Sequence, residues 1–166
     1  MGQVRRALVV CLLLLVTAAL GGAAVWAGQA RDAAQAAEDD RRSAARAAAV
    51  HAVNLLSVDH RTVDDDMKRV VATSTGEERE EYARNEAALK KATVDNKVVQ
   101  TGVLRATGLA SMTRDRRAAE VLIVADAVIH WEDGRKAAPE ERFYRWRMEV
   151  TKTGGVWLVS KAELVQ

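Results

Sequence analysis

The longest apolar run of the chain lies near its N-terminus. Residues 7–27, ALVVCLLLLVTAALGGAAVWA, carry no charged side chain. At about 1.5 Å per helical residue, roughly 20 such residues span the hydrocarbon core of a bilayer. Arg5 and Arg6 precede the run, and positive charge favours the cytoplasmic side. We therefore expect a cytoplasmic tail over residues 1–6, a single plasma-membrane helix over residues 7–27, and an extracytoplasmic C-terminal part.

A cleaved signal peptide is the alternative, since Val25-Trp26-Ala27 offers small residues near a cleavage point. The apolar run is longer than the usual core of a signal peptide, which favours a retained anchor. Ala18 and Gly22 stand four residues apart within it, a spacing of small residues that permits a contact between membrane helices. Cys11, the only cysteine, lies in the same run, so no intrachain disulfide is expected.

Residues 28–56 predict a long helix, because they are rich in alanine and contain no proline. Within this segment, larger apolar residues occur only near its end, at Val50, Val53, Leu55 and Leu56. We expect a solvated stalk that joins the folded core only in its last two turns. The folded domain itself is expected to occupy residues 57–166.

The remaining pattern predicts two more helices and then four strands. A short helix is expected over residues 63–73, and a capping-box spacing at Thr75 and Glu78 begins another that reaches about residue 92. Valine-rich or alternating runs predict strands over residues 94–109, 118–131, 141–151 and 156–165, with Gly102 as a bulge and Gly154-Gly155 as a hairpin turn. Tyr144, Trp146, Met148 and Val150 share one face of the third strand. Helices followed by antiparallel strands predict an α+β fold, a cone-like domain of helices packed on a strongly bent, about four-stranded sheet.

Charge is nearly balanced along the chain. It has 25 Lys and Arg against 23 Asp and Glu, a formal net charge of +2. A nucleic-acid-binding domain of this size normally carries a strong basic excess. We therefore expect no nucleic-acid partner.

The stretch SVDHRTVDDD, residues 57–66, concentrates four carboxylates and His60. Successive helical residues turn by about 100°, so Asp64, Asp65 and Asp66 fan out and are not expected to bind one metal. They suit a helix start instead, with Thr62 as N-cap and Asp65 at the third helical position. Lys68 and Arg69 follow Asp64 and Asp65 by four residues and are the expected ion-pair partners.

A metal or acid/base role for Asp59 and His60 is the competing interpretation of this stretch. No third ligand stands at a familiar spacing. We expect His60 in a turn, and neither a metal nor another cofactor.

The enzyme hypothesis rests on other residues. Asp126 and His130 share one face of a predicted strand, and Tyr144 and Trp146 lie on the next strand. An acid/base pair in an apolar pocket would suit an isomerase or dehydratase. The alternative is that Asp126 and His130 face solvent or pair with arginines. We expect no catalytic residue and keep the four as candidates for a pocket.

Three segments resemble the actinobacterial Mce-associated (mammalian cell entry-associated) membrane proteins: LLSVDHRTVDDDMKRVVATSTGEEREEY, NKVVQTGVLRATGLASMTRDRRAAEVLIVAD and GGVWLVSKAEL. Trp157 stands where that family has it, whereas His60 replaces a typical aromatic residue. The resemblance implies a nuclear-transport-factor-like, cystatin-like domain. It also implies a non-catalytic accessory role, in which the protein contacts Mce transporter subunits and stabilises or assembles a lipid or sterol import complex.

Two other functions remain open from the sequence. The same plan of anchor and domain resembles the bitopic assembly factors of type IV secretion and conjugation systems. The third possibility is a protein that binds a small apolar ligand, or an enzyme, using the interior of the cone. Convergence of Asp126, His130 and Tyr144 in a deep pocket would favour the third function.

Overall fold

The computed structural model describes the backbone of residues 2–132, 134 and 138–165, and the side chains of residues 17, 20–22, 26–132, 134 and 138–165. The chain divides into two compact units, residues 1–39 and 40–166. Among the described side chains, no helix combines the length and apolar character needed to cross a bilayer. Most of the predicted anchor, with Cys11 and Ala18, lies outside those side chains, so the anchor and the contact at Ala18 and Gly22 stay predictions.

The three helices precede the four long strands, and the α+β class is confirmed. The elements are α1 (Gly2–Leu56), β1 (Val58–Asp59), α2 (Val63–Ala72), α3 (Gly76–Asp95), β2 (Val98–Met112), β3 (Ala118–Trp131), β4 (Glu140–Thr153) and β5 (Val156–Leu164). The chain was expected to enter its first long strand at residue 94, but α3 continues to Asp95. Asn96 caps it, donating its backbone N–H to the carbonyl oxygen of Ala92. Lys97 then turns the backbone at a φ of 47°.

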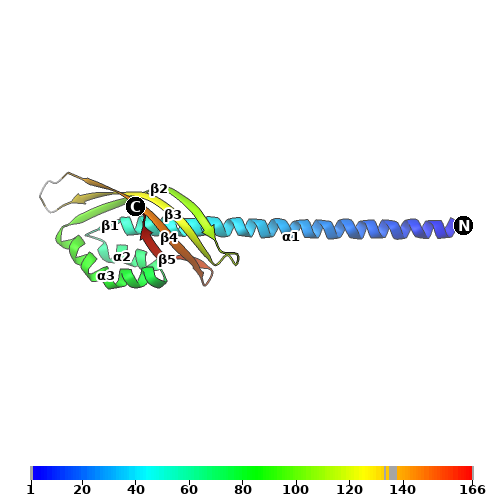
Figure 1. Ribbon diagram of the computed structural model, residues 1–166, viewed down its shortest axis with the longest axis horizontal. Coiled ribbons are helices and arrows are strands. Elements are labelled where there is room, and N and C mark those ends of the chain that lie inside the picture. The colour runs from blue at the N-terminus through cyan, green and yellow to red at the C-terminus, as the bar shows by residue number, and fades with distance from the viewer. Residues whose placement is uncertain (1, 133, 135–137, 166) are drawn as a thin grey trace. The chain divides into compact units, whose positions relative to one another are not determined.

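All described strands form one antiparallel sheet in the order β1-β2-β3-β4-β5. The fifth strand, β1, was not predicted: Val58 and Asp59 pair with Gln100 and Val99 at the edge of the sheet. Register shifts follow Leu104 and Leu109 in β2 and Glu149 in β4. Such bulges bend strands and increase their twist. The sheet accordingly curls around the helices of the 40–166 unit, and none of the described helices covers its outer face (Figure 1).

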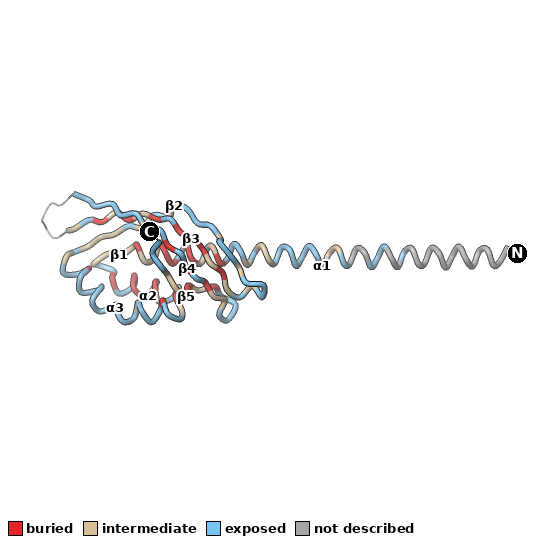
Figure 2. The backbone as a smooth tube through the Cα atoms, in the orientation of Figure 1, coloured by how far each residue is buried: buried red, intermediate tan, exposed pale blue. Residues whose placement is uncertain are grey.

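The core lies between the concave face of the sheet and the C-terminal part of α1 (Figure 2). Trp146, Met148 and Val150 of β4 point into it, as their predicted alternation requires. Helix α1 presents a ridge of small residues, Ala44, Ala48 and Ala52, each with no exposed surface. Val50, expected in the core, is 46% exposed. The prediction that only the last two turns of α1 enter the core is wrong, because alanines every fourth residue form its packing face.

Gly102 lies where the end of α1 passes over β2. A Cβ atom built on Gly102 would stand 2.5 Å from the Cβ of Leu56 and 3.2 Å from the Oγ of Ser57. The backbone N–H of Gly102 donates a hydrogen bond of 3.2 Å to that same Oγ. The predicted bulge is wrong at this position, since the register shifts fall further along β2. Glycine is required here by close packing.

His51 is the polar centre of the helical layer. Its side chain has no exposed surface, its Nδ1 lies 2.8 Å from Thr73 Oγ1, and its Nε2 lies 3.2 Å from Glu78 Oε1. Glu78 was expected to complete a capping box with Thr75, but Thr75 makes no side-chain cap. The Glu78 carboxylate instead faces α1. Buried polar groups need partners, and these two contacts tie α1 to the end of α2 and the start of α3.

The contact at Gly102 gives a test of this packing. We expect Gly102→Ala to lower the free energy of unfolding by about 1–3 kcal/mol, because the added methyl group overpacks the junction with Leu56. Urea unfolding of the full chain followed by circular dichroism measures the effect. Gly108→Ala in the same strand is the control, since nothing lies within 4 Å of its added Cβ; it should be neutral or stabilising. Equal destabilisation by both variants would contradict the role assigned to Gly102.

Candidate functional site

The four residues proposed for a pocket lie on opposite faces of the sheet. Asp126 is paired across the strands with Phe143, and Ala125 with Tyr144. Cross-strand partners point to the same face, so Asp126 and His130 face outward while Tyr144 and Trp146 face the core. Asp126 forms an ion pair with Arg105, and Tyr144 stacks on Trp146 with ring centroids 5.0 Å apart. The hypothesis of a shared pocket is wrong.

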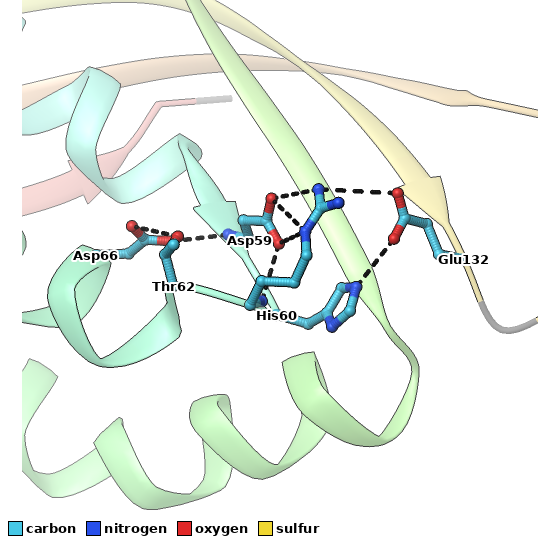
Figure 3. Close-up of polar contacts among 6 residues, drawn as sticks. Asp59, His60, Thr62, Asp66 and Glu132 are labelled. Carbon is cyan, nitrogen blue, oxygen red and sulfur yellow. Dashed lines mark hydrogen bonds and ion pairs between the residues drawn. The ribbon is translucent and has the colours of Figure 1, made fainter.

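The stretch from Asp59 to Arg61 forms a polar cluster with the end of β3 (Figure 3). The carboxylate of Asp59 accepts hydrogen bonds from the Arg61 side chain, at 2.6 Å from Nη2 and 2.8 Å from Nε, and from the Arg61 backbone N–H at 2.9 Å. His60 Nε2 lies 3.0 Å from Glu132 Oε2, and Arg61 Nη2 is 3.8 Å from the other oxygen of Glu132. These contacts join the turn before α2 to a segment more than 70 residues later.

Asp66, rather than Asp65, organises the start of α2. Its nearly buried carboxylate accepts hydrogen bonds from the backbone N–H of Asp59 at 2.7 Å and from the Thr62 hydroxyl at 3.1 Å, and pairs with Arg69 at 2.6 Å. The predicted capping box of Thr62 and Asp65 is therefore wrong. Helix geometry alone brings both Asp65 and Asp66 within reach of Thr62, because they follow it by three and four residues. Only the packing of α2 in the folded domain selects Asp66.

The three aspartates do diverge, as predicted. Asp64 pairs with Lys90 of α3, Asp65 with Lys68, and Asp66 with Arg69. The cation partners differ from the predicted ones, because α3 supplies Lys90 and the pairs within α2 span three residues. Within the described residues, no group of three or more His, Cys, Asp or Glu side chains could hold a metal ion.

Electrostatics in the cluster stabilise ionised carboxylates. Hydrogen bonds from the Arg61 side chain lower the pKa of Asp59 from 3.8 to about 2. The hydrogen bond with His60 is the main cause that lowers the pKa of Glu132. A general acid or base needs a pKa near the working pH, and these shifts move the carboxylates away from it. The cluster therefore has the character of a structural link between the turn before α2 and Glu132, and we call it the Asp59–Arg61 clamp.

A second candidate is a groove lined by α1, the end of α2, and the β4–β5 hairpin; we call it the α1–β5 groove. Its volume is about 460 Å³, and Val50, Val156 and Trp157 contribute to its wall. At one end Lys152 Nζ lies 2.6 Å from Asp40 Oδ1 and 5.7 Å from the centroid of the Trp157 ring. The hydrogen bond from Lys152 is the main cause that lowers the pKa of Asp40.

Sequence reasoning missed this groove. Residues from positions 40–50, 72–73 and 152–158 line it, and no local motif links those segments. Its cation–π and ion-pair contacts exist only because the hairpin folds back beside α1. Exposed apolar side chains beside charged ones are typical of surfaces that bind another molecule.

The geometry defines a class: an α+β domain whose helices pack on the inner face of a curled antiparallel sheet. Solved structures of other proteins share this fold. The VirB8 protein of Agrobacterium tumefaciens matches with a TM-score of 0.60 at 11% identity, over 76% of this chain and 92% of that one. The periplasmic domain of DotI matches with a TM-score of 0.59 at 13% identity, over 73% and 91%. At these identities the likeness concerns the fold.

The sequence itself places the chain in a family. A profile of the family described as "Uncharacterized protein Rv1363c/MT1408-like" matches residues 3–166, so the chain belongs to this family. Rv1363c of Mycobacterium tuberculosis (strain ATCC 25618 / H37Rv) is 34% identical over 133 residues, which cover 79% of this chain and 49% of that relative. The chain thus spans about half the length of the relative. The relative supports the actinobacterial part of the predicted resemblance; the Mce-associated part remains a prediction.

The Asp59–Arg61 clamp predicts a pH-dependent stability. The depressed pKa of Asp59 contributes stability that is complete above 3.8 and is lost as the pH falls through about 2. We expect Asp59→Asn to be less stable than the wild type near neutral pH, with the difference shrinking between pH 3.8 and about 2. Urea unfolding at a series of pH values measures this difference.

The control for the clamp is the same substitution in an Arg61→Gln background. Without the guanidinium, Asp59→Asn should cost less, and the cost should shrink less over that pH range, because only the hydrogen bond from the backbone N–H of residue 61 still favours the ionised carboxylate. An unchanged pH dependence in the Arg61→Gln background would show that another group causes it.

Proposed function

We propose that this protein is a non-catalytic, single-pass membrane protein whose α+β domain helps to assemble a multiprotein complex of the cell envelope, in the manner of a bitopic assembly factor of a type IV secretion-like system. The observation that carries the proposal is the inner face of the sheet. Trp146, Met148 and the α1 alanines pack together there, so binding is expected on the outside of the domain.

The likeness of folds supports the secretion-like part of the proposal. VirB8 and the periplasmic domain of DotI share this architecture over more than 90% of their own compared lengths. CagV of Helicobacter pylori, a VirB8 homologue of a type IV secretion system, has the same fold with a TM-score of 0.57. A shared fold does not by itself establish a shared function. The test of the proposal is therefore to identify the partner protein.

The proposed location follows from the N-terminus. An uncharged run over residues 7–27 after Arg5 and Arg6 favours an anchor with its N-terminus in the cytoplasm and the domain outside the plasma membrane. The periplasmic origin of the DotI domain is consistent with that orientation. The membrane lipid bilayer and a subunit of an envelope complex are the partners in this proposal, and no nucleic acid is among them.

The second candidate function is assembly or stabilisation of an Mce-type lipid or sterol import complex. Three segments of the chain favour it by resemblance, among them GGVWLVSKAEL with Trp157. Trp157 is 7% exposed and belongs to the core. Both candidate functions involve the same mechanism, in which a domain held near the membrane contacts transporter or secretion subunits. They differ in the identity of the partner.

A crosslinking experiment tests the proposal. The full-length chain carries an affinity tag at its C-terminus and is expressed in its native host; cells are treated with a membrane-permeable crosslinker, and captured proteins are identified by mass spectrometry. We expect subunits of one envelope complex to be enriched over an untagged strain. Secretion subunits would favour the first candidate, and Mce transporter subunits the second.

The control for this capture is a tagged chain in which an unrelated single-pass helix replaces residues 1–27. Partners of the folded domain should still be captured, whereas proteins that merely share the membrane environment of the native helix should not. Recovery of no subunit from either kind of complex would contradict the proposed function.

A further inference from the structure

Apolar side chains contribute to the wall of the α1–β5 groove, among them Ala47, Val50, Val156 and Leu158. Val156 is 59% exposed and Val50 is 46% exposed. Exposed branched side chains gathered in one concave surface favour association with another apolar surface. The groove thus contains a preformed apolar surface.

Charged side chains also line the groove, namely Asp40, Arg46 and Lys152. A neighbouring hollow of about 390 Å³ shares Asp40, Lys152 and Gly155 with it and adds Arg116 and Arg117. Both carboxylates at this end already have partners. Asp40 is bound by Lys152 and lies 3.6 Å from Arg116. Asp115 accepts hydrogen bonds from the Thr113 hydroxyl at 2.6 Å and from the Arg117 backbone N–H at 3.2 Å.

Arg46 and Arg117 contribute positive charge to this surface. In the part of the chain that the structure describes, no carboxylate lies within ion-pair distance of Arg46, which lines the groove, or of Arg117, which lines the adjoining hollow. Both side chains belong to exposed residues. The charge of Arg117 nevertheless helps to lower the pKa of Asp115 in that hollow, after the hydrogen bonds from Thr113 and from the Arg117 backbone. The groove and the adjoining hollow together carry four basic side chains, Arg46, Arg116, Arg117 and Lys152, and two acidic ones, Asp40 and Asp115, so their combined charge is positive. An occupant with carboxylates is complementary to it.

The edge of β5 offers backbone hydrogen bonds to the same groove. Val159 turns its N–H and C=O outward, where the carbonyl of Thr73 and the N–H of Thr75 bind them. Hydrogen-bonding direction alternates along a strand, so Trp157, two residues earlier, turns its N–H and C=O toward the same edge. Trp157 lines the groove. A donor and an acceptor side by side on a strand edge match an extended polypeptide, which neither a lipid headgroup nor a phosphate reproduces.

We propose that the α1–β5 groove docks an acidic, extended segment of a partner protein. Apolar side chains of the segment contact Val50 and Val156, its backbone lies along β5 at Trp157, and its carboxylates pair with Arg46 and Arg117. This inference rests on the proposed function, for which it names the contact surface and the chemistry of the partner. Charge complementarity and the strand edge select a peptide over other anionic molecules.

Site-specific photocrosslinking tests the inference in the full-length protein. The probe amino acid p-benzoyl-phenylalanine is placed at Val156 in the groove or at Phe143, which is 74% exposed on the outer face of the sheet. Both chains are expressed in the native host, irradiated, and the crosslinked peptides sequenced by mass spectrometry. We expect Val156 to crosslink an envelope-complex subunit through a segment rich in Asp, Glu and apolar residues, and Phe143 not to reach that segment.

Charge reversal supplies the second measurement. The double variant Arg46→Glu, Arg117→Glu should reduce the yield of the Val156 crosslink roughly tenfold, because two attractive pairs become repulsive. Arg79→Glu with Arg84→Glu on the exposed surface of α3 changes the net charge equally and should leave the yield unchanged. Raising the salt concentration in isolated membranes before irradiation should lower the wild-type yield.

The outcomes separate this inference from the proposed function. Crosslinking of a complex subunit through Phe143 but not through Val156 would retain the assembly role and overturn the groove as its docking surface. A Val156 crosslink to phospholipid or to a basic segment, or a yield insensitive to the reversal of Arg46 and Arg117, would also overturn it. Failure of both positions to crosslink any envelope subunit would count against the assembly role itself.

Discussion

The close packing of α1 on the concave face of the sheet is the constraint on which the rest of the domain depends. Ala44, Ala48 and Ala52 are fully buried, and their small side chains let the helix approach strands that carry large ones. At the end of the helix, Leu56 meets Gly102, where no side chain fits. Interiors are packed nearly as densely as organic crystals, so a helix of this shape fills the space that a curled sheet would otherwise leave for a ligand. That filling directs binding to the outside.

Polar contacts then determine how the smaller helices sit around this centre. His51 contacts Thr73 and Glu78, and the Asp66 carboxylate accepts hydrogen bonds from the turn before α2. The Asp59–Arg61 pair and Glu132 extend the same network to β3. Each of these acidic groups is satisfied by a partner inside the domain. They consequently support the architecture, whereas Arg46 in the α1–β5 groove has no carboxylate within ion-pair distance among the described residues.

Much of the fold was predictable from local pattern. Alternation along β4 placed Tyr144, Trp146, Met148 and Val150 on one face, and the glycines at 154 and 155 take the positive φ angles, 59° and 87°, that a tight hairpin needs. The ends of β3 were also predicted, because long apolar alternation is a strong signal. By contrast β1, two residues long, has no periodicity to detect, and Gly102 carries no sign of the helix that passes over it. The candidate pocket failed for a related reason: alternation says that Asp126 and His130 share a face, but the register with β4 decides which face Tyr144 shares.

The sequence by itself determined the order of the three helices and the four long strands, the hairpin turn at Gly154-Gly155 and the alternating faces, because these follow from backbone geometry and side-chain polarity over a few neighbouring residues. It also determined that the aspartates at positions 64–66 diverge, since a helix rotates each by about 100°. Only the tertiary structure decided that α1 fills the sheet with alanines, that Glu78 binds His51 rather than capping its own helix, and that Asp40, Lys152 and Trp157 meet in one groove. Those outcomes depend on the packing of segments up to 112 residues apart, and no local pattern of side chains encodes which distant partner will fit.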